Sequence, residues 1–124
     1  MNIASTAGFL PGPLMAVYYA TKAYVLSFTE ALANELNGTG VQICAFCPGP
    51  TTTGFQEAAG MSGARLKRLK AMMPAAAAAH YGYHSMFKGK SIILPGFFNK
   101  LTPVMVRLFP RKIMTQMIRS LSGK

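Results

Sequence analysis

The sequence predicts an α/β fold in which helices connect the strands of a parallel sheet. Three stretches support this prediction: an apolar, strand-like start at residues 1–5, an uninterrupted helical stretch at 14–36, and an apolar β-rich run at 41–46. A strand, a helix and a strand in this order form the repeating unit of a parallel sheet. The chain has 124 residues, 51% of them hydrophobic, which suffices for one domain but not for two.

The first half of the chain contains all three elements. Residues 6–13 predict a loop, because two glycines and two prolines fall within eight positions. Tyr24, Phe28 and Leu32 then recur at the spacing of one helix face, with no Pro or Gly between 14 and 36. Asn37 and Gly38 follow as a helix stop signal, so the next strand begins shortly after them.

The second half is less regular. Residues 51–73 predict a long loop that carries a short basic helix, and Pro74 can occupy the first turn of a helix that ends near residue 86 or 87. Residues 90–94 predict another short strand. Between 97 and 121 we expect two short amphipathic stretches, because Pro103 and Pro110 interrupt a continuous helix.

Positive charge is concentrated in this second half. Residues 1–64 carry one lysine and three glutamates, whereas residues 65–124 carry twelve bases and no acid, and the chain has a net charge of +10. Such a balance can favour nucleic acid, but no zinc-finger spacing or aromatic RNA-binding motif accompanies the basic cluster at 65–70. A short basic cluster is more often a solvated helix face, so nucleic-acid binding remains the weaker alternative.

Composition excludes several classes of protein. The apolar content argues against disorder, and two cysteines cannot form a disulfide-rich secreted scaffold. No apolar run approaches the ~20 residues of a membrane span, and the start has no basic segment typical of a signal peptide. We therefore expect a cytoplasmic globular chain, with a location at the membrane surface as the alternative.

Tyr18 and Lys22 are the first candidates for chemistry. They lie four residues apart on the expected helix, so their side chains share one face, and an ammonium group beside a phenol favours the phenolate. The pair alone is weak evidence, because surface helices contain such pairs by chance. Ser5 lies at the end of the first strand, and a loop with the sequence PGPTTT (48–53) follows the next one. Open parallel sheets bind ligands at this carboxyl edge.

Together these segments resemble the short-chain dehydrogenase/reductase family. The resemblance rests on NIASTAG (2–8), YYATKA (18–23) with its Tyr-x-x-x-Lys spacing, and Pro48-Gly49-x-x-x-Thr53. It extends to GKSIILPG (89–96), which sits where the last sheet strand of the family falls. The family implies a Rossmann-type, doubly wound parallel sheet.

The resemblance also implies an activity and a role for each matching residue. The activity is the NAD- or NADP-dependent interconversion of an alcohol and a carbonyl. Ser5 would polarise the substrate oxygen, Tyr18 would be the general acid/base, and Lys22 would hold the nicotinamide ribose and lower the pKa of Tyr18. Tyr19 is a competing phenol, but only Tyr18 has the four-residue spacing to Lys22. The residues lining the nicotinamide side would be Pro48, Gly49, Thr51 and Thr53.

The chain also departs from the family pattern. Members begin with a strand, a Gly-rich turn and a helix that receives the cofactor pyrophosphate, and no such turn occurs in this sequence. We therefore expect the C-terminal part of such a domain, without the N-terminal dinucleotide-binding strands. Its expected parts are an active-site unit (1–55), a lid and helix (56–88) and a last strand with a basic tail (89–124). Such a chain would be inactive without the cofactor-binding half.

Two residue pairs invite a metal or redox interpretation. Cys44 and Cys47 form a C-x-x-C, but residues three apart on a strand point to opposite faces, which favours two buried core cysteines. His80 and His84 lie four apart on an expected helix without a Cys, Asp or Glu partner nearby. We therefore expect a feature of the helix surface and no metal site.

Three segments suggest partners. Residues 61–73 occupy the position of the family's substrate lid, where flexible methionines suit a small hydrophobic carbonyl or alcohol, although an ordinary amphipathic cover is the alternative. The helix over 18–36 is expected to mediate homo-oligomerisation. The basic, apolar stretch at 97–121 fits an anionic membrane surface or a neighbouring subunit equally well. A catalytically inactive fragment that acts as an interaction or peripheral membrane module is thus the alternative function.

Overall fold

A computed structural model describes residues 1–55 and 72–122 of the chain. Its main sheet has the strand order β1 (Asn2–Ile3), β2 (Ala45–Phe46) and β5 (Ile92–Ile93), and both pairings are parallel. Across the sheet, the first residues of the three strands lie opposite one another. The predicted α/β architecture with a parallel sheet is confirmed.

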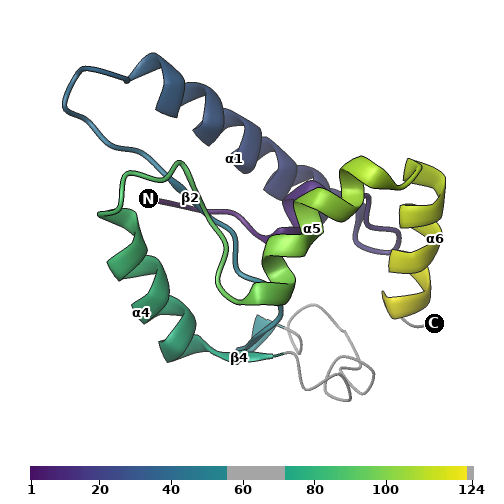
Figure 1. Ribbon diagram of the computed structural model, residues 1–124. Helices are drawn as coiled ribbons and strands as arrows, with labels where there is room; N and C mark the ends of the chain where they lie inside the picture. The colour runs from purple at the N-terminus through teal and green to yellow at the C-terminus, as the bar shows by residue number, and fades with distance from the viewer. Residues whose placement is uncertain (56–71, 123–124) are drawn as a thin grey trace.

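Helices cover both faces of this sheet. α1 (Ala16–Glu35) lies on one side and α4 (Ala75–Met86) on the other, with β2 between them (Figure 1). The middle strand separates two small core clusters, because alternate residues of a strand point to opposite faces. Ala45 and Cys47 pack with Leu26 of α1, whereas Phe46 packs with Ala78 of α4.

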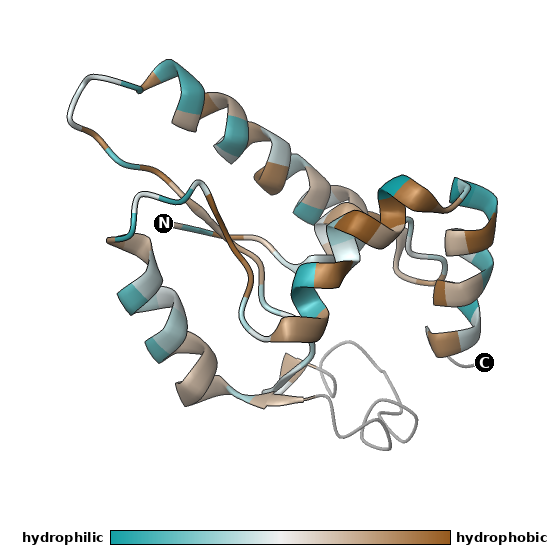
Figure 2. Ribbon diagram, viewed as in Figure 1, coloured by the Kyte–Doolittle hydropathy of each residue, from teal (hydrophilic) through white to brown (hydrophobic). Residues whose placement is uncertain are grey.

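The chain ends in α5 (Phe97–Leu108) and α6 (Arg111–Ser122), which lie beyond the carboxyl ends of the strands (Figure 1). Both helices alternate hydrophobic and hydrophilic residues along their length (Figure 2). The expected interruption at Pro103 is wrong: α5 continues through it and loses only the hydrogen bond that a proline cannot donate. The break falls at Phe109 and Pro110, as the second proline predicts.

Several element boundaries differ from the prediction. α1 begins two residues later than expected, because Leu14 has a φ of 70°, which is incompatible with a right-handed helix. Strand pairing covers only residues 45–46 and 92–93, whereas the apolar runs are longer. The expected long loop contains a separate parallel pair, β3 (Thr51–Thr52) and β4 (Met73–Pro74). The expected basic helix and most of the expected lid lie outside the described residues.

Candidate active site

Ser5 lies directly after β1 and is fixed by the backbone around it. It is the N-cap of η1, a 3-10 helix over Thr6–Phe9, and its hydroxyl oxygen accepts a hydrogen bond from the backbone N–H of Ala7 (3.1 Å). The same hydroxyl donates to the carbonyl of Pro48, at the longer distance of 3.4 Å. This second bond is weak, so the proton of Ser5 remains available for a stronger acceptor.

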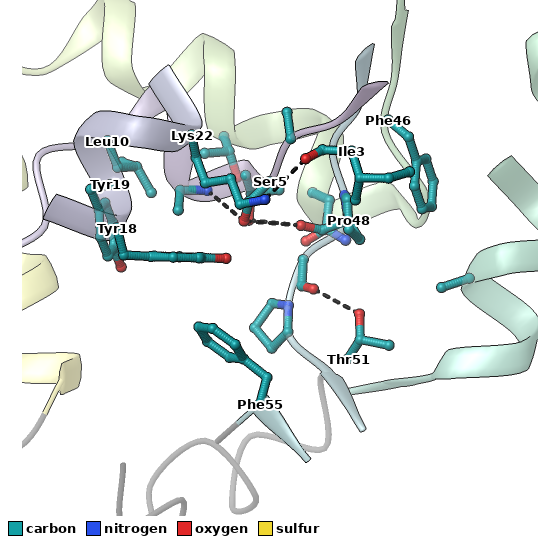
Figure 3. Close-up of a pocket in the computed structure, with 18 of the residues that line it drawn as sticks. Ile3, Ser5, Leu10, Tyr18, Tyr19, Lys22, Phe46, Pro48, Thr51 and Phe55 are labelled. Atoms are coloured by element: carbon teal, nitrogen blue, oxygen red, sulfur yellow. Dashed lines mark hydrogen bonds between the residues drawn. The ribbon is translucent and has the colours of Figure 1, made fainter. Parts of the chain in front are cut away.

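Tyr18 and Lys22 lie one turn apart at the start of α1, as predicted. The Lys22 ammonium lies 5.8 Å from the centre of the Tyr18 ring and donates a hydrogen bond to the carbonyl of Ile3 (3.0 Å). The Tyr18 hydroxyl points into the pocket on the side where Ser5 and Pro48 lie (Figure 3). The ammonium is thus held between the phenol ring and the end of β1.

A glycine permits this close approach of the two elements. A Cβ added to Gly8 in η1 would lie 2.8 Å from the backbone carbonyl oxygen of Lys22 in α1. Backbone atoms on a helix cannot move aside as a flexible side chain can. Gly8 therefore allows Ser5, at the cap of η1, and Lys22, on α1, to face the same space.

The neighbouring phenol of Tyr19 has a different environment. Burial, and secondarily the nearby Tyr18, raises the pKa of Tyr19 above its ordinary value of 10.0. Its ring packs against Gly12, where a Cβ would overlap it. A raised pKa keeps Tyr19 protonated, so it is a packing residue and a poor proton acceptor.

The loop after β2 forms the opposite side of the site. The Thr51 hydroxyl donates to the carbonyl of Gly49 (2.9 Å), which closes the turn. A Cβ at Gly49 would overlap the side chain of Asn99 in α5. Asn99 in turn donates to the carbonyl of Pro95 (2.6 Å). The glycine therefore lets the loop and α5 meet without a gap.

A single pocket of about 940 Å³ collects all of the predicted site residues. They come from the start of η1, from α1 and from the segment after β2, and are Ser5, Tyr18, Lys22, Pro48, Gly49, Thr51 and Thr53. Their placement is a finding of the structure, whereas their roles remain predictions.

Sequence reasoning missed the other half of the lining. Phe55 packs on Tyr18 with 5.0 Å between ring centres, and Tyr83 reaches the pocket from α4. The largest contribution comes from α5 and α6, whose apolar lining residues are Phe98, Leu101, Met105, Met114, Met117, Ile118 and Leu121. The amphipathic pattern of these helices marks an apolar face, but the sequence does not show that this face turns toward Tyr18.

The cysteine and histidine pairs lie in different surroundings. Cys44 and Cys47 are free and buried in different core clusters, and burial raises the pKa of the Cys47 thiol to about 12. The His80 and His84 rings lie on the exposed side of α4 with their Nε2 atoms 3.1 Å apart. Within residues 1–55 and 72–122, no group of three or more His, Cys, Asp or Glu side chains is placed to hold a metal ion.

Comparison with known proteins identifies the family. The family model for short chain dehydrogenases matches residues 1–62, half of the chain. The chain belongs to the short-chain dehydrogenase family. Among curated members, a 3-oxoacyl-(acyl-carrier-protein) reductase from a Synechocystis species is 42% identical over 57 residues, which make up 46% of this chain and 23% of that enzyme.

Solved short-chain dehydrogenases share the fold over a larger part of the chain. One from Sphingobium yanoikuyae, in complex with NADPH, matches 86% of this chain and 42% of its own, with a TM-score of 0.67 and 26% identity. A 7β-hydroxysteroid dehydrogenase matches 95% of this chain and 46% of its own, with a TM-score of 0.78 and 22% identity. The chain thus matches less than half of these two structures and a quarter or less of the curated relatives.

Proposed function

We propose that this chain carries the catalytic and nicotinamide-side residues of an NAD(P)-dependent oxidoreductase that interconverts an alcohol and a carbonyl. The observation that carries the proposal is the convergence of Ser5, Tyr18 and Lys22 on one pocket at the carboxyl edge of the sheet. Backbone N–H groups of Ala4 and Thr6 donate to the carbonyls of Phe46 and Pro48, which ties the Ser5 segment to β2 and its loop. The Lys22 ammonium ties α1 to the carbonyl of Ile3. Ligands of open parallel sheets bind at this edge.

In the direction of reduction, Tyr18 donates its phenolic proton to the substrate oxygen. The Ser5 hydroxyl donates a hydrogen bond to the same oxygen, in place of its weak bond to Pro48. The phenolate left on Tyr18 gains stability from the Lys22 ammonium beside its ring. In the direction of oxidation, the phenolate takes the proton from the alcohol and the same contacts favour its formation.

The residues present fit the nicotinamide end of the cofactor. When bound, the nicotinamide ring supplies or accepts the hydride. The Lys22 ammonium has three donors and uses one on Ile3, which leaves donors for the ribose hydroxyls. Gly49 lines the pocket, and the carbonyl of Pro48 lies beside the Ser5 hydroxyl. Thr51 and Thr53 add hydroxyls to the same wall.

The substrate is a hydrophobic alcohol or carbonyl compound. Apart from the catalytic residues and the threonines, the lining is mainly apolar, and α5 and α6 supply seven of its large apolar side chains. A pocket of about 940 Å³ lies at the upper end of the size range of small-molecule sites. Burial of apolar substrate surface against these helices supplies the binding energy.

A chimera tests the catalytic assignment without knowledge of the natural substrate. The segment of the Synechocystis reductase that aligns with this chain is replaced by the matching residues of this chain, and turnover of the 3-oxoacyl substrate is measured. The chimera should remain active, and Tyr18→Phe should lower kcat by roughly 10²–10⁴-fold. The matched control, Tyr19→Phe, should leave kcat largely unchanged. A chimera that is insensitive to Tyr18→Phe would contradict the assignment.

The chain by itself should bind the cofactor weakly. The sequence has no Gly-rich turn of the kind that leads into the helix receiving the cofactor pyrophosphate, so the residues that fit the cofactor are those at its nicotinamide end. Titration of NADPH or NADH fluorescence should therefore show no tight, saturable binding, and turnover should be absent. Tight saturable binding would mean that the described pocket holds the whole dinucleotide.

The outer face of α1 is the proposed contact between two copies of the chain. Val17, Tyr24 and Phe28 recur on one side of the helix and are exposed, and the last two rings stack at 5.7 Å. Sedimentation velocity should report an oligomer that Tyr24→Ser weakens. A wild-type chain that remains monomeric at high concentration would exclude this contact.

A further inference from the structure

An exposed apolar stripe runs along the whole of α5. It consists of Phe97, Leu101, Val104 and Leu108, which are 72%, 41%, 50% and 72% exposed. Their spacing of four, three and four residues places them on one side of the helix. Large apolar side chains that gather in this way on a surface mark a site that binds a protein, a membrane or an apolar ligand.

Basic side chains surround this stripe. Lys100 and Arg107 flank it on α5, and Arg111, Lys112 and Arg119 lie on α6. All five are exposed, and residues 97–122 contain no acid. A cationic helix with a bare apolar side is the arrangement that lies flat in the interface of an anionic membrane.

The stripe leads directly into the pocket. Leu101 belongs to the stripe and also lines the pocket, and Met105, on the next side of the helix, lines the pocket and is itself exposed. Figure 2 shows apolar residues continuing along α5 and onto α6. An apolar molecule at the stripe would therefore meet apolar side chains all the way to the pocket.

We propose that α5 and α6 dock this chain on an anionic lipid surface, with the stripe in the headgroup region and the pocket opening toward the lipid. The helices lie on the membrane and do not cross it: among the described residues no helix is long and apolar enough to span a bilayer. Delivery of a hydrophobic substrate from the lipid rests on the proposed function, whereas the docking itself does not.

Charge distinguishes lipid from a second copy of the chain. Two copies that met through α5 and α6 would bring five positive charges against five others with no acid between them. An anionic lipid surface offers the complementary charge, and each base near that surface strengthens binding about fivefold.

Vesicle sedimentation with the full chain tests the proposal. The chain should sediment with vesicles of phosphatidylcholine mixed with phosphatidylglycerol, and far less with phosphatidylcholine alone. Binding should weaken as salt is added, because ions screen the attraction. Equal binding to both vesicles, or no binding to either, would overturn the proposal. The assay needs no turnover, so its failure would leave the catalytic assignment intact.

Paired variants locate the surface. The double variant Phe97→Ser with Leu108→Ser removes two exposed side chains that do not line the pocket, and it should weaken vesicle binding at least tenfold. The matched control, Val41→Ser with Phe87→Ser, removes an exposed aliphatic and an exposed aromatic residue elsewhere. This control should bind vesicles as the unchanged chain does. An equal loss of vesicle binding in the two double variants would overturn the proposal.

A second pair separates local charge from net charge. Lys100→Gln with Arg107→Gln should weaken binding about tenfold or more, whereas Lys88→Gln with Lys90→Gln, which removes the same charge outside α5 and α6, should have a much smaller effect. Equal effects of the two pairs would mean that vesicle binding depends on net charge alone and would overturn the proposed surface.

Sedimentation velocity without lipid tests whether the stripe instead binds a second copy of the chain. A dimer that dissociates in the variant Phe97→Ser with Leu108→Ser would assign the stripe to a second copy. Retention of a nucleic acid in preference to vesicles would likewise overturn the proposal.

Discussion

On one side of the pocket, backbone hydrogen bonds join β1 and η1 to β2 and the loop after it, and Gly8 of η1 lies close against the Lys22 carbonyl of α1. On the other side, α5 has no buried residue at all. α6 buries only Met114 and Ile118. The first wall carries the polar groups proposed for proton transfer, and the second carries apolar side chains. The family match, which covers residues 1–62, includes the first wall and excludes the second.

The difference between the two walls suits the two tasks proposed for the pocket, which are proton transfer and the binding of an apolar substrate. Proton transfer requires hydroxyl and ammonium groups held at fixed distances, which close backbone packing provides. Accommodation of an apolar substrate requires area and some adaptability, which exposed Leu and Met side chains on loosely packed helices provide. Substitutions in the two walls should therefore differ in kind: the first should affect folding, and the second should affect binding.

The largest effect should come from the sheet. Phe46→Ala removes a buried ring that packs with Ala78 and Ile93 and lies against Gly82, and it should lower the free energy of unfolding by about 3–5 kcal/mol. Phe97→Ala is the matched change on α5, where the ring is largely exposed, and it should shift stability by about 0.5 kcal/mol or less. Urea unfolding measures both. Similar losses would mean that α5 is packed as firmly as the sheet.

A smaller effect is expected where η1 meets α1. Gly8→Ala places a Cβ against the Lys22 backbone, forces the two elements apart and should cost about 1–3 kcal/mol of stability. Gly54→Ala is the control: its added Cβ meets nothing within 4 Å and its φ is not positive. It should be neutral or stabilising by about 0.4–1 kcal/mol. If thermal unfolding ranks the two alike, the close approach at Gly8 does not hold the site together.

The first wall could be predicted from the sequence because its features follow from the regular geometry of helices and parallel strands. Four-residue spacing on a helix places Tyr18 and Lys22 on one face in any fold, and Ser5 and Pro48 follow strands whose carboxyl ends must share an edge. The opposite faces of Cys44 and Cys47 followed from the two-residue period of a strand in the same way. The helix face and the strand faces depend only on neighbours in the chain, whereas the meeting of Ser5 and Pro48 follows from the parallel pairing of β1 with β2.

The remaining features depend on contacts between distant residues. Thr51 pairs with Met73 across the segment that lies outside the described residues, so no local pattern marks either as a strand. Residues 41–43 have strong β-propensity but lie outside the β1–β2 pairing, which begins with Asn2 opposite Ala45. α5 remains helical at Pro103, although a proline inside a helix is locally destabilising and predicts an interruption. The sequence also did not predict that α5 and α6 line the pocket, because an amphipathic pattern predicts an apolar side but does not identify what that side contacts.

A small effect on stability, and the clearest effect on binding, should come from Met105 in the second wall. Met105→Ala shortens a pocket-lining side chain on a helix without buried residues, so stability should change by less than about 1 kcal/mol. Affinity for a long-chain methyl ketone, measured by titration calorimetry, should fall about tenfold because apolar contact area is lost. Val104→Ala is the matched control, since Val104 is the neighbouring residue, is exposed and does not line the pocket. If both variants weaken ketone binding equally, the ligand lies along the outer stripe of α5 and not in the pocket. If neither variant weakens ketone binding, α5 contributes no binding surface to the ligand. The assignment of proton transfer to the first wall and substrate binding to the second wall would then be wrong.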